Sequence, residues 1–247
     1  GYSGCIFRLC AYKCYKMKIY FAGSFSGLTP NQLKNIGIKN KLYSYANDQQ
    51  QISLWGNKGL MLDSGAFTAF TKGIDIDIDN LTLYIKNLNP DYAIQLDVIG
   101  NEEKTWSNYL KQKQDIPNIL PVIHYNATDK HIKRVLNVAD YVLLGGLVPY
   151  AKDKPKLMKW LDYLYGKHKL VAKKTHLLGI TTQTILERYP VYSSDSSSAL
   201  SIVRYPSSSK INIMKQKTKH YTELYEVGIK PIIELEHYIT NLWERRG

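Results

Sequence analysis

The stretch NILPVIHYNATDKHIKRVLNVADYVLLGGL, residues 118–147, predicts one strand–helix–strand unit. Residues 118–125 and 140–147 are short and nearly continuous apolar runs, the pattern of strands that are buried on both faces. Between them, Thr128 is a helix-capping residue, and the apolar residues of 128–139 recur at helical spacing. Two strands joined by a helix form a parallel pair with a right-handed crossover. The stretch therefore predicts a parallel α/β fold.

The same alternation continues along the chain in both directions. Further strands are expected at 18–24, 59–67, 91–100, 174–180 and 190–197, and further helices at 79–90, 102–114, 155–166 and 181–188. With an eighth strand near 210–214 and two closing helices from about 215 to 246, the pattern predicts an α/β fold of the (β/α)8 TIM-barrel type in a single domain. A doubly wound open sheet is the alternative. Residues 25–58 are longer than a usual connection and indicate an inserted helix or hairpin.

The predicted helix at 102–114 is expected to pack against the core through one face. In 102–114, the spacing of Trp106, Tyr109 and Leu110 predicts that these three side chains face inward.

The composition is that of a folded protein with an excess of positive charge. The chain has 33 Lys and Arg against 21 Asp and Glu, a net charge of +12. This charge favours a polyanionic partner, of which nucleic acid is the commonest, although a lysine-rich composition that keeps a protein in solution gives the same count. No run reaches the roughly 18 apolar residues that a membrane span needs.

The cysteines are confined to the first residues of the chain. Cys5, Cys10 and Cys14 are the only cysteines of the sequence, so no disulfide framework is expected in the body, which fits a cytoplasmic protein. Their spacing matches no common zinc or ferredoxin pattern. Because MKIYFAGS, beginning at Met17, is typical of a chain start followed by a strand, residues 1–16 are interpreted as an N-terminal extension and 17–247 as the barrel.

Polar and glycine residues follow one predicted strand after another. They are Asp63, Asp97, His124, Gly145 and Gly146, Gly179, and Asp195. In a barrel the carboxyl ends of all strands meet on one face, and that face holds the active site. Each residue also has a purely structural interpretation. The aspartates could cap turns or helices, the histidine could be an ordinary rim residue, and the glycines could only let the chain turn.

Asp195 is the most unusual of these residues because five serines surround it in VYSSDSSSAL, residues 191–200. A carboxylate at a buried strand end needs hydrogen-bond donors, and we expect Ser194 and Ser196 to supply them. The sequence contains no metallohydrolase histidine pair, nucleophile elbow, P-loop or dinucleotide fingerprint. What remains is a set of carboxylates, and two carboxylates suit displacement at a sugar anomeric carbon.

At these positions the sequence resembles the tRNA-guanine transglycosylase superfamily. The similar segments, in the same order, are DSGAFTAF (63–70), LDVIG (96–100), LLGGL (143–147), HLLGI (176–180) and YSSDSSS (192–198). The sequences of these segments are more similar to the phage and bacterial branch that inserts 7-deazaguanine into DNA than to the tRNA enzymes. The resemblance implies a (β/α)8 enzyme that expels guanine from nucleic acid through a covalent aspartyl–sugar intermediate and needs no cofactor.

The resemblance also implies roles for individual residues. Asp195 would be the nucleophile and Asp63 the acid/base. Base recognition would fall to Asp97, the backbone of Gly145 and Gly146, a stacking Phe67 and, more loosely, His124. Arg204 and Lys210 follow the nucleophile strand and would contact phosphates of a base-flipped substrate.

The chain departs from the tRNA enzymes in two ways. It has no cysteine after Cys14 for their C-terminal zinc site, so no metal is expected, and their arginine-containing segment after the nucleophile is not matched. DNA is therefore favoured over tRNA as the substrate. Two other functions stay open, a non-catalytic basic barrel that binds nucleic acid and a different enzyme that uses the N-terminal cysteines.

Overall fold

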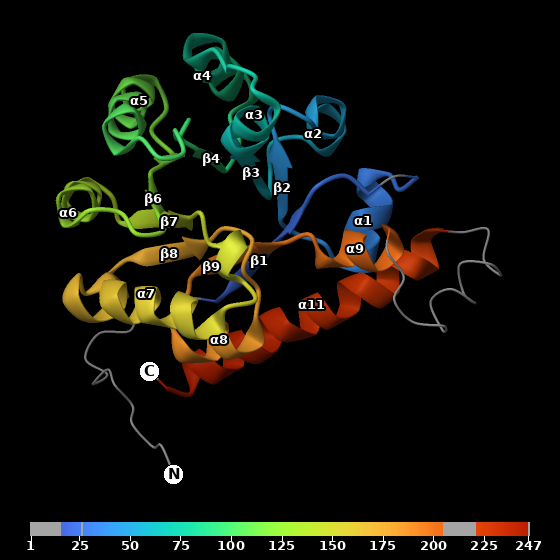
Figure 1. The fold of residues 1–247 in the computed structure, drawn as a ribbon. Coiled ribbons are helices and arrows are strands. Elements are labelled where there is room, and N and C mark those ends of the chain that lie inside the picture. Colours follow the sequence, from blue (N-terminus) through green and yellow to red (C-terminus); the bar gives the residue numbers. More distant parts are fainter. Residues whose placement is uncertain (1–15, 26, 205–220, 247) are drawn as a thin grey trace.

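The computed structural model describes residues 16–25, 27–204 and 221–246. Strands and helices alternate along these residues, and the strands gather into one ring with the helices outside it (Figure 1). Every strand pair in the ring is parallel. The protein is thus an α/β barrel in a single domain, as the alternating pattern predicts.

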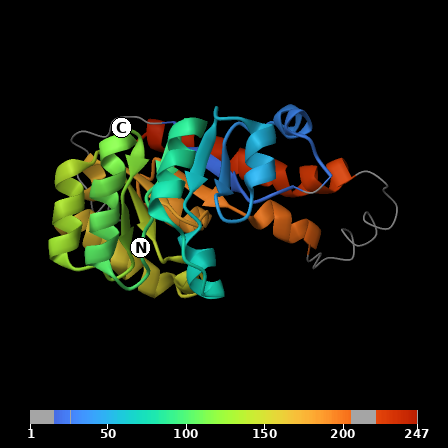
Figure 2. The ribbon, with the colours of Figure 1, turned by 90° about the horizontal axis from the view of Figure 1, so that it is seen from above.

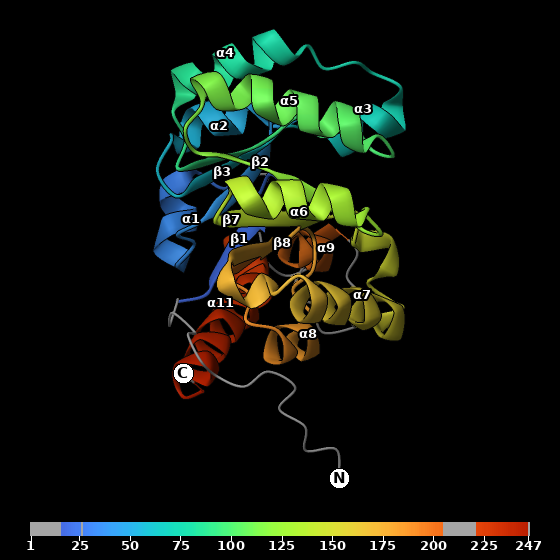
Figure 3. The same cartoon turned by 90° about the vertical axis from the view of Figure 1, so that its left-hand side faces the viewer.

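The described residues form nine strands. They are β1 (Lys18–Ala22), β2 (Lys41–Ser44), β3 (Leu60–Asp63), β4 (Tyr92–Ile94), β5 (Ile119–Leu120), β6 (Val122–His124), β7 (Tyr141–Gly145), β8 (Lys174–Leu177) and β9 (Ser193–Ser196). The helices outside them are α1 (Pro30–Ile36), α2 (Gln49–Trp55), α3 (Ala66–Lys72), α4 (Ile78–Leu88), α5 (Glu102–Asp115), α6 (Asp129–Val138), α7 (Lys154–Lys167), α8 (Gln183–Arg188), α9 (Ser198–Arg204) and α11 (Tyr221–Glu244), with short 3-10 turns at Val148–Tyr150 and Leu170–Ala172. Figure 3 shows α4, α5, α6 and α7 following one another around the outside of the ring.

The ring is nearly closed, and its one interruption lies at Pro121. The hydrogen-bonded order runs β5-β4-β3-β2-β1-β9-β8-β7-β6, so the two ends of the order are consecutive pieces of one chain. Pro121 has no N–H to donate to a neighbouring strand and divides this stretch into the short strands β5 and β6. Its carbonyl still accepts from the N–H of Leu143 at 2.9 Å, and the side chain of Gln95 accepts from the N–H of Val122 at 3.3 Å.

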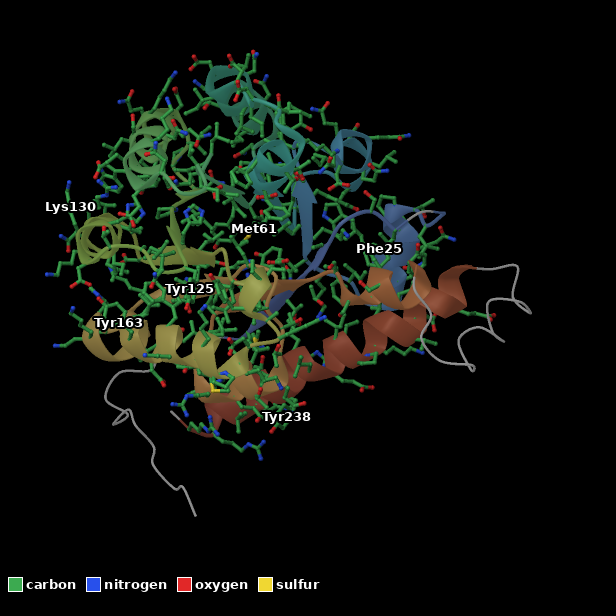
Figure 4. All side chains as sticks on the ribbon, viewed as in Figure 1. Phe25, Met61, Tyr125, Lys130, Tyr163 and Tyr238 are labelled. Carbon is green, nitrogen blue, oxygen red and sulfur yellow. The ribbon has the colours of Figure 1, made fainter. Side chains whose placement is uncertain are left out.

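Two apolar clusters occupy the two faces of the strands. The inner cluster, which includes Met61 near the middle of the molecule (Figure 4), consists of Tyr20, Leu42, Met61, Ile94, Leu120, Val122, Tyr141, Leu143 and Tyr192. The outer cluster alternates with it along each strand and packs under the helices. Since successive side chains of a strand point to opposite faces, this alternation tells which residues can reach the interior of the barrel.

The stretch 25–58 contains a ring strand that the sequence pattern misses. It was expected to hold an inserted helix or hairpin, and it holds β2 between α1 and α2. The expected strand at 210–214 lies outside the described residues, and β9 bonds directly to β1 without a strand between them.

Lys41 accounts for the missed strand, because a charged residue inside a short run does not look like a buried strand. The side chain is fully buried in the outer face. Its ammonium nitrogen donates to the carbonyl of Gly23 at 2.6 Å and lies 4.4 Å from the ring centroids of both Phe25 and Tyr43. Burial lowers the pKa of Lys41 well below its usual value, against the opposing effect of the Asp48 carboxylate.

Residues 221–244 form one long helix in the region where two closing helices from about 215 were expected, and residues 215–220 lie outside the described residues. Helix α11 runs without interruption over Tyr221–Glu244, although Pro231 lies inside it. Figure 2 shows it along one side of the ring. It anchors the start of the first strand, because Glu236 accepts from the N–H of Ile19 at 2.5 Å and Thr240 from the N–H of Met17 at 3.1 Å. None of the helices in the described ranges is long and apolar enough to cross a membrane.

Candidate active site

The carboxyl end of the barrel collects the polar residues that follow the strands. Asp63 ends β3, His124 ends β6, Gly145 ends β7, and Asp195 lies in β9. The register places Asp195 beside Tyr20, an inner-cluster residue, and Asp63 is two residues past Met61, so both carboxylates point into the barrel. Asp97 joins them from the segment that follows β4, which ends at Ile94 and is shorter than expected. The structure thus brings three of the predicted carboxylates to one mouth.

Asp195 is held through one of its two oxygens. Its side-chain Oδ1 accepts from the backbone N–H of Gly179 at 2.7 Å and lies 3.2 Å from Nε2 of His176. Only 7% of the residue is exposed. Hydrogen bonds to a buried carboxylate offset the cost of removing it from water. Within the described part of the chain Oδ2 has no hydrogen bond, which leaves this oxygen available to a ligand.

Gly179 can approach Asp195 because it lacks a side chain. Its φ of +72° is a left-handed conformation, and a Cβ at this position would lie 2.5 Å from Cγ2 of Val148. The sequence flagged this glycine only as a rim residue. Its backbone N–H is the shorter of the two contacts that hold the carboxylate.

The expectation that Ser194 and Ser196 orient Asp195 is wrong. Residues one position away along a strand point to the opposite face, and both serines therefore point outward. The hydroxyl of Ser196 pairs with Ser198 at 2.7 Å. The buried hydroxyl of Ser194 has no partner among the described residues. The serine that does reach the interior is Ser193, two positions before the aspartate.

Ser193 links Asp195 to two further buried residues that the sequence did not single out. Its hydroxyl lies 2.7 Å from Nδ1 of His176 and 2.5 Å from the hydroxyl of Tyr141. The edge of the Tyr20 ring packs against the imidazole of His176, with centroids 5.8 Å apart. Alternation along β9 could have placed Ser193 on the same face as Asp195. The pairing of His176 with Ser193 comes from the register of β8 and β9, which the structure shows.

The environment of Asp63 raises the affinity of its carboxyl group for a proton. Burial raises the pKa of Asp63 to about 7, and the charges of Asp97 and Asp195 raise it in the same direction. The backbone N–H of Gly65 opposes the shift. A carboxyl group that titrates near neutrality can both give and take a proton at physiological pH.

Asp97 pairs with His124 at the mouth of the barrel. Its Oδ2 lies 2.7 Å from Nε2 of His124, and both side chains are mostly buried, with 14% and 18% exposed. The sequence placed both residues in the base pocket but did not pair them. The imidazole occupies one carboxylate oxygen and can orient the other toward a ligand.

Polar side chains of α5 hold the segment that carries Asp97. Asn108 donates to the carbonyl of Leu96 at 2.8 Å, Gln112 accepts from the N–H of Leu96 at 2.8 Å, and Thr105 accepts from the N–H of Val98 at 2.9 Å. The expected inward residues of this helix are partly right. Tyr109 is buried and Trp106 packs against the core, but Leu110 is 46% exposed. Because this segment has no ladder partner, buried polar side chains replace the apolar contact that periodicity predicts.

The glycine pair lies beside the Asp97–His124 contact. A Cβ on Gly145 would lie 2.8 Å from Cγ1 of Val122 and 3.2 Å from the His124 ring, so only glycine leaves the histidine where it is. Gly146 has a φ of +67°. The carbonyl of Gly145 accepts from the N–H of Tyr125 at 2.9 Å.

The remaining predicted site residues lie farther out. Phe67 is in the first turn of α3, just past Asp63, and is 67% exposed rather than enclosed in the mouth. Arg204 is the last residue of α9. Lys210 and the three cysteines lie outside the described residues.

A fourth carboxylate lies near Asp63 and was not anticipated. Asp48 precedes α2, and its two oxygens accept from the hydroxyl of Ser24 at 2.5 Å and from the N–H of Ser44 at 2.9 Å. Its charge adds to the rise in the pKa of Asp63. With both oxygens bonded, Asp48 fits a structural role.

Within residues 16–25, 27–204 and 221–246, no group of three or more His, Cys, Asp or Glu side chains could hold a metal ion. At the barrel mouth the described side chains offer two carboxyl groups, Asp195 held by Gly179 and His176 and Asp63 with a raised pKa. No protein-family model and no curated protein matches this chain.

Proposed function

We propose that this barrel is a base-exchanging transglycosylase that replaces guanine in nucleic acid, with DNA favoured, by a 7-deazaguanine. The observation that carries the proposal is the contrast between two interior carboxyl groups. Asp195 is held as an acceptor by Gly179 and His176, whereas the pKa of Asp63 is raised to about 7. Two interior carboxyl groups, one held as a hydrogen-bond acceptor and one with a raised pKa, fit the nucleophile and acid/base roles of glycosyl-transferring enzymes.

Asp195 is suited to attack a sugar carbon. Its Oδ2 would form a bond to C1′ of the guanosine unit while the bond from C1′ to N9 of guanine breaks. The electron pair of the broken bond leaves with guanine, and Asp63 supplies the proton that makes it a neutral leaving group. The incoming 7-deazaguanine then loses a proton to Asp63 and forms a bond to C1′ on the face that guanine left. The bond from C1′ to Oδ2 breaks and its electron pair returns to the Asp195 carboxylate, so configuration is retained.

The base pocket rests on the resemblance together with the contacts around Asp97. A guanine edge presents N–H donors, and the carboxylate of Asp97 is an acceptor that His124 holds in place. Gly145 and Gly146 lie next to this pair. The target base must leave its stack to reach a barrel mouth, which implies base flipping. The net charge of +12 supports a polyanionic substrate.

The direct test is exchange of labelled guanine. The full-length chain is incubated with labelled guanine and either guanine-containing DNA or tRNA, and label in the nucleic acid is counted. We expect incorporation into DNA, with little into tRNA. Incorporation into tRNA alone would reverse the substrate assignment. Binding without incorporation in either would instead favour a non-catalytic nucleic-acid-binding barrel.

Substitution of Asp97 should alter base selection more than rate. Asp97→Asn replaces an acceptor by a group that also donates, so the N–H edge of guanine meets a mismatched partner. We expect reduced discrimination between guanine and adenine in a competition assay. The matched control is His124→Gln, which keeps a donor beside the carboxylate and should keep the discrimination. If Asp97→Asn lowers the rate but leaves the discrimination unchanged, Asp97 does not recognise the base.

Binding of DNA should weaken steeply with salt. Lysine and arginine side chains displace counterions from phosphates, so a site with about six phosphate contacts loses about 10³-fold in affinity between 50 and 200 mM salt. Fluorescence anisotropy of a labelled DNA over this range measures the slope. An affinity that does not change with salt would argue against a polyanionic substrate.

A further inference from the structure

A chain of hydrogen bonds runs through the barrel interior and ends on Asp195. It leads from the hydroxyl of Tyr141 on β7 to Ser193 at 2.5 Å, from Ser193 to Nδ1 of His176 at 2.7 Å, and from Nε2 of His176 to Asp195 at 3.2 Å. Ser193 and His176 are completely buried and Tyr141 nearly so. Three strands thus contribute one continuous polar path inside an otherwise apolar cluster.

The donor and the acceptor of each hydrogen bond in this path can be assigned by starting from Tyr141. Burial raises the pKa of Tyr141 well above its usual value, so this buried hydroxyl stays protonated and its hydrogen needs an acceptor. Ser193 is the hydrogen-bond partner of that hydroxyl within the described part of the chain, and its oxygen accepts the proton. The serine then has its own proton to give, and Nδ1 of His176 is the acceptor within reach.

The imidazole therefore has its N–H at the other nitrogen. A neutral imidazole that accepts at Nδ1 donates at Nε2, and Nε2 faces Oδ1 of Asp195. The ring cannot easily rotate away because Tyr20 packs edge-on against it. The N–H of Gly179 donates to the same oxygen, so both contacts converge on Oδ1.

We propose that Tyr141, Ser193 and His176 are positioning residues that fix the Nε2–H tautomer of His176 and thereby select Oδ2 of Asp195 as the attacking oxygen. The role of Oδ2 as the attacking oxygen rests on the proposed function, whereas the tautomer of His176 and the orientation of the carboxylate do not. The path differs from a catalytic triad, because the carboxylate is the group being oriented and the imidazole is completely buried.

The test combines a spectroscopic readout with kinetics. Nitrogen-15 NMR of histidine-labelled protein without substrate should show His176 as the Nε2–H tautomer. Ser193→Ala removes the donor to Nδ1, so we expect a second population protonated at Nδ1 and a kcat lower by about tenfold with KM little changed. Ser194→Ala is the matched control. It removes an adjacent hydroxyl that points outward, and we expect it to change neither readout.

The outcomes separate the two proposals. A wild-type His176 protonated at Nδ1 would overturn the positioning role whatever the activity. An unchanged tautomer in Ser193→Ala would do the same, and if that variant does not fold, the same measurement on Tyr141→Phe replaces it, with tautomer exchange expected. The expected tautomer without base exchange on any substrate would leave the positioning of Asp195 standing and remove the proposed function.

Discussion

We expect Asp195→Asn to abolish base exchange, with a loss on the order of 10⁶-fold, the scale seen when a covalent nucleophile is removed. The amide oxygen can accept from Gly179 and His176 as Oδ1 does, so the interior contacts survive. The amide nitrogen takes the place of Oδ2 and cannot form an ester with the sugar. The variant should therefore fold and bind DNA normally while it neither exchanges guanine nor forms an adduct.

The matched control for this variant is Ser194→Ala, one position away on the same strand. Its buried hydroxyl has no partner among the described residues, so its removal should leave exchange unchanged and the free energy of unfolding equal or slightly higher. Label incorporation, DNA affinity and thermal unfolding are measured for both. Exchange at the wild-type rate by Asp195→Asn would show that this carboxylate is not the nucleophile.

Asp63→Asn should slow the chemical step by about 10²- to 10⁴-fold, the usual contribution of a general acid/base. The amide can neither protonate the leaving guanine nor accept a proton from the incoming base. In the wild type, the pH profile of single-turnover rates should show an apparent pKa near 7, since burial and the charges of Asp97 and Asp195 raise the pKa of Asp63 to about that value. That step should disappear in the variant.

The same substitution should stabilise the fold at high pH. Because the folded protein holds a proton on Asp63 up to about pH 7 and the unfolded chain releases it near pH 4, the free energy of unfolding falls as the pH rises between those values. The raised pKa corresponds to at most about 4 kcal/mol at pH 8, and solvent around the half-buried carboxyl reduces it.

Asparagine mimics the protonated acid at every pH. Denaturant unfolding should therefore find Asp63→Asn more stable than wild type at pH 8 and nearly equal to it at pH 4. An equal difference in stability at both pH values would show that Asp63 does not titrate between them. A normal rate in a variant that shows the expected stabilisation would separate the burial of Asp63 from any role in the reaction.

Much of the fold follows from patterns within single strands and helices. Runs that are mostly apolar predict β1, β3 and β7 because both faces of a barrel strand are covered. Strand β2 escapes this pattern because Lys41 is buried by contacts with Gly23, Phe25 and Tyr43, which come together only in the folded chain. The division of the fifth position of the ring into β5 and β6 follows from Pro121.

The candidate site also has features that the sequence predicts and features that depend on the folded chain. The placement of Asp63, Asp97, His124 and Asp195 at one mouth follows from the convergence of parallel strand ends. The hydrogen-bond partners of Asp195 could not be predicted in this way. The five nearby serines suggest themselves as donors, but strand alternation decides which of them lie on the same face as the carboxylate. The raised pKa of Asp63 depends first on burial and then on the charges of Asp97 and Asp195, which lie far from it along the chain.

The most direct test of the account is intact-mass spectrometry of the protein after an acid quench, following incubation with guanine-containing DNA and no incoming base. We expect a covalent species whose mass is the sum of protein and DNA less one guanine. Peptide mapping should place the adduct on Asp195, and the Asp195→Asn variant should form no such species. The absence of any adduct while exchange proceeds, or an adduct that persists in Asp195→Asn, would contradict it.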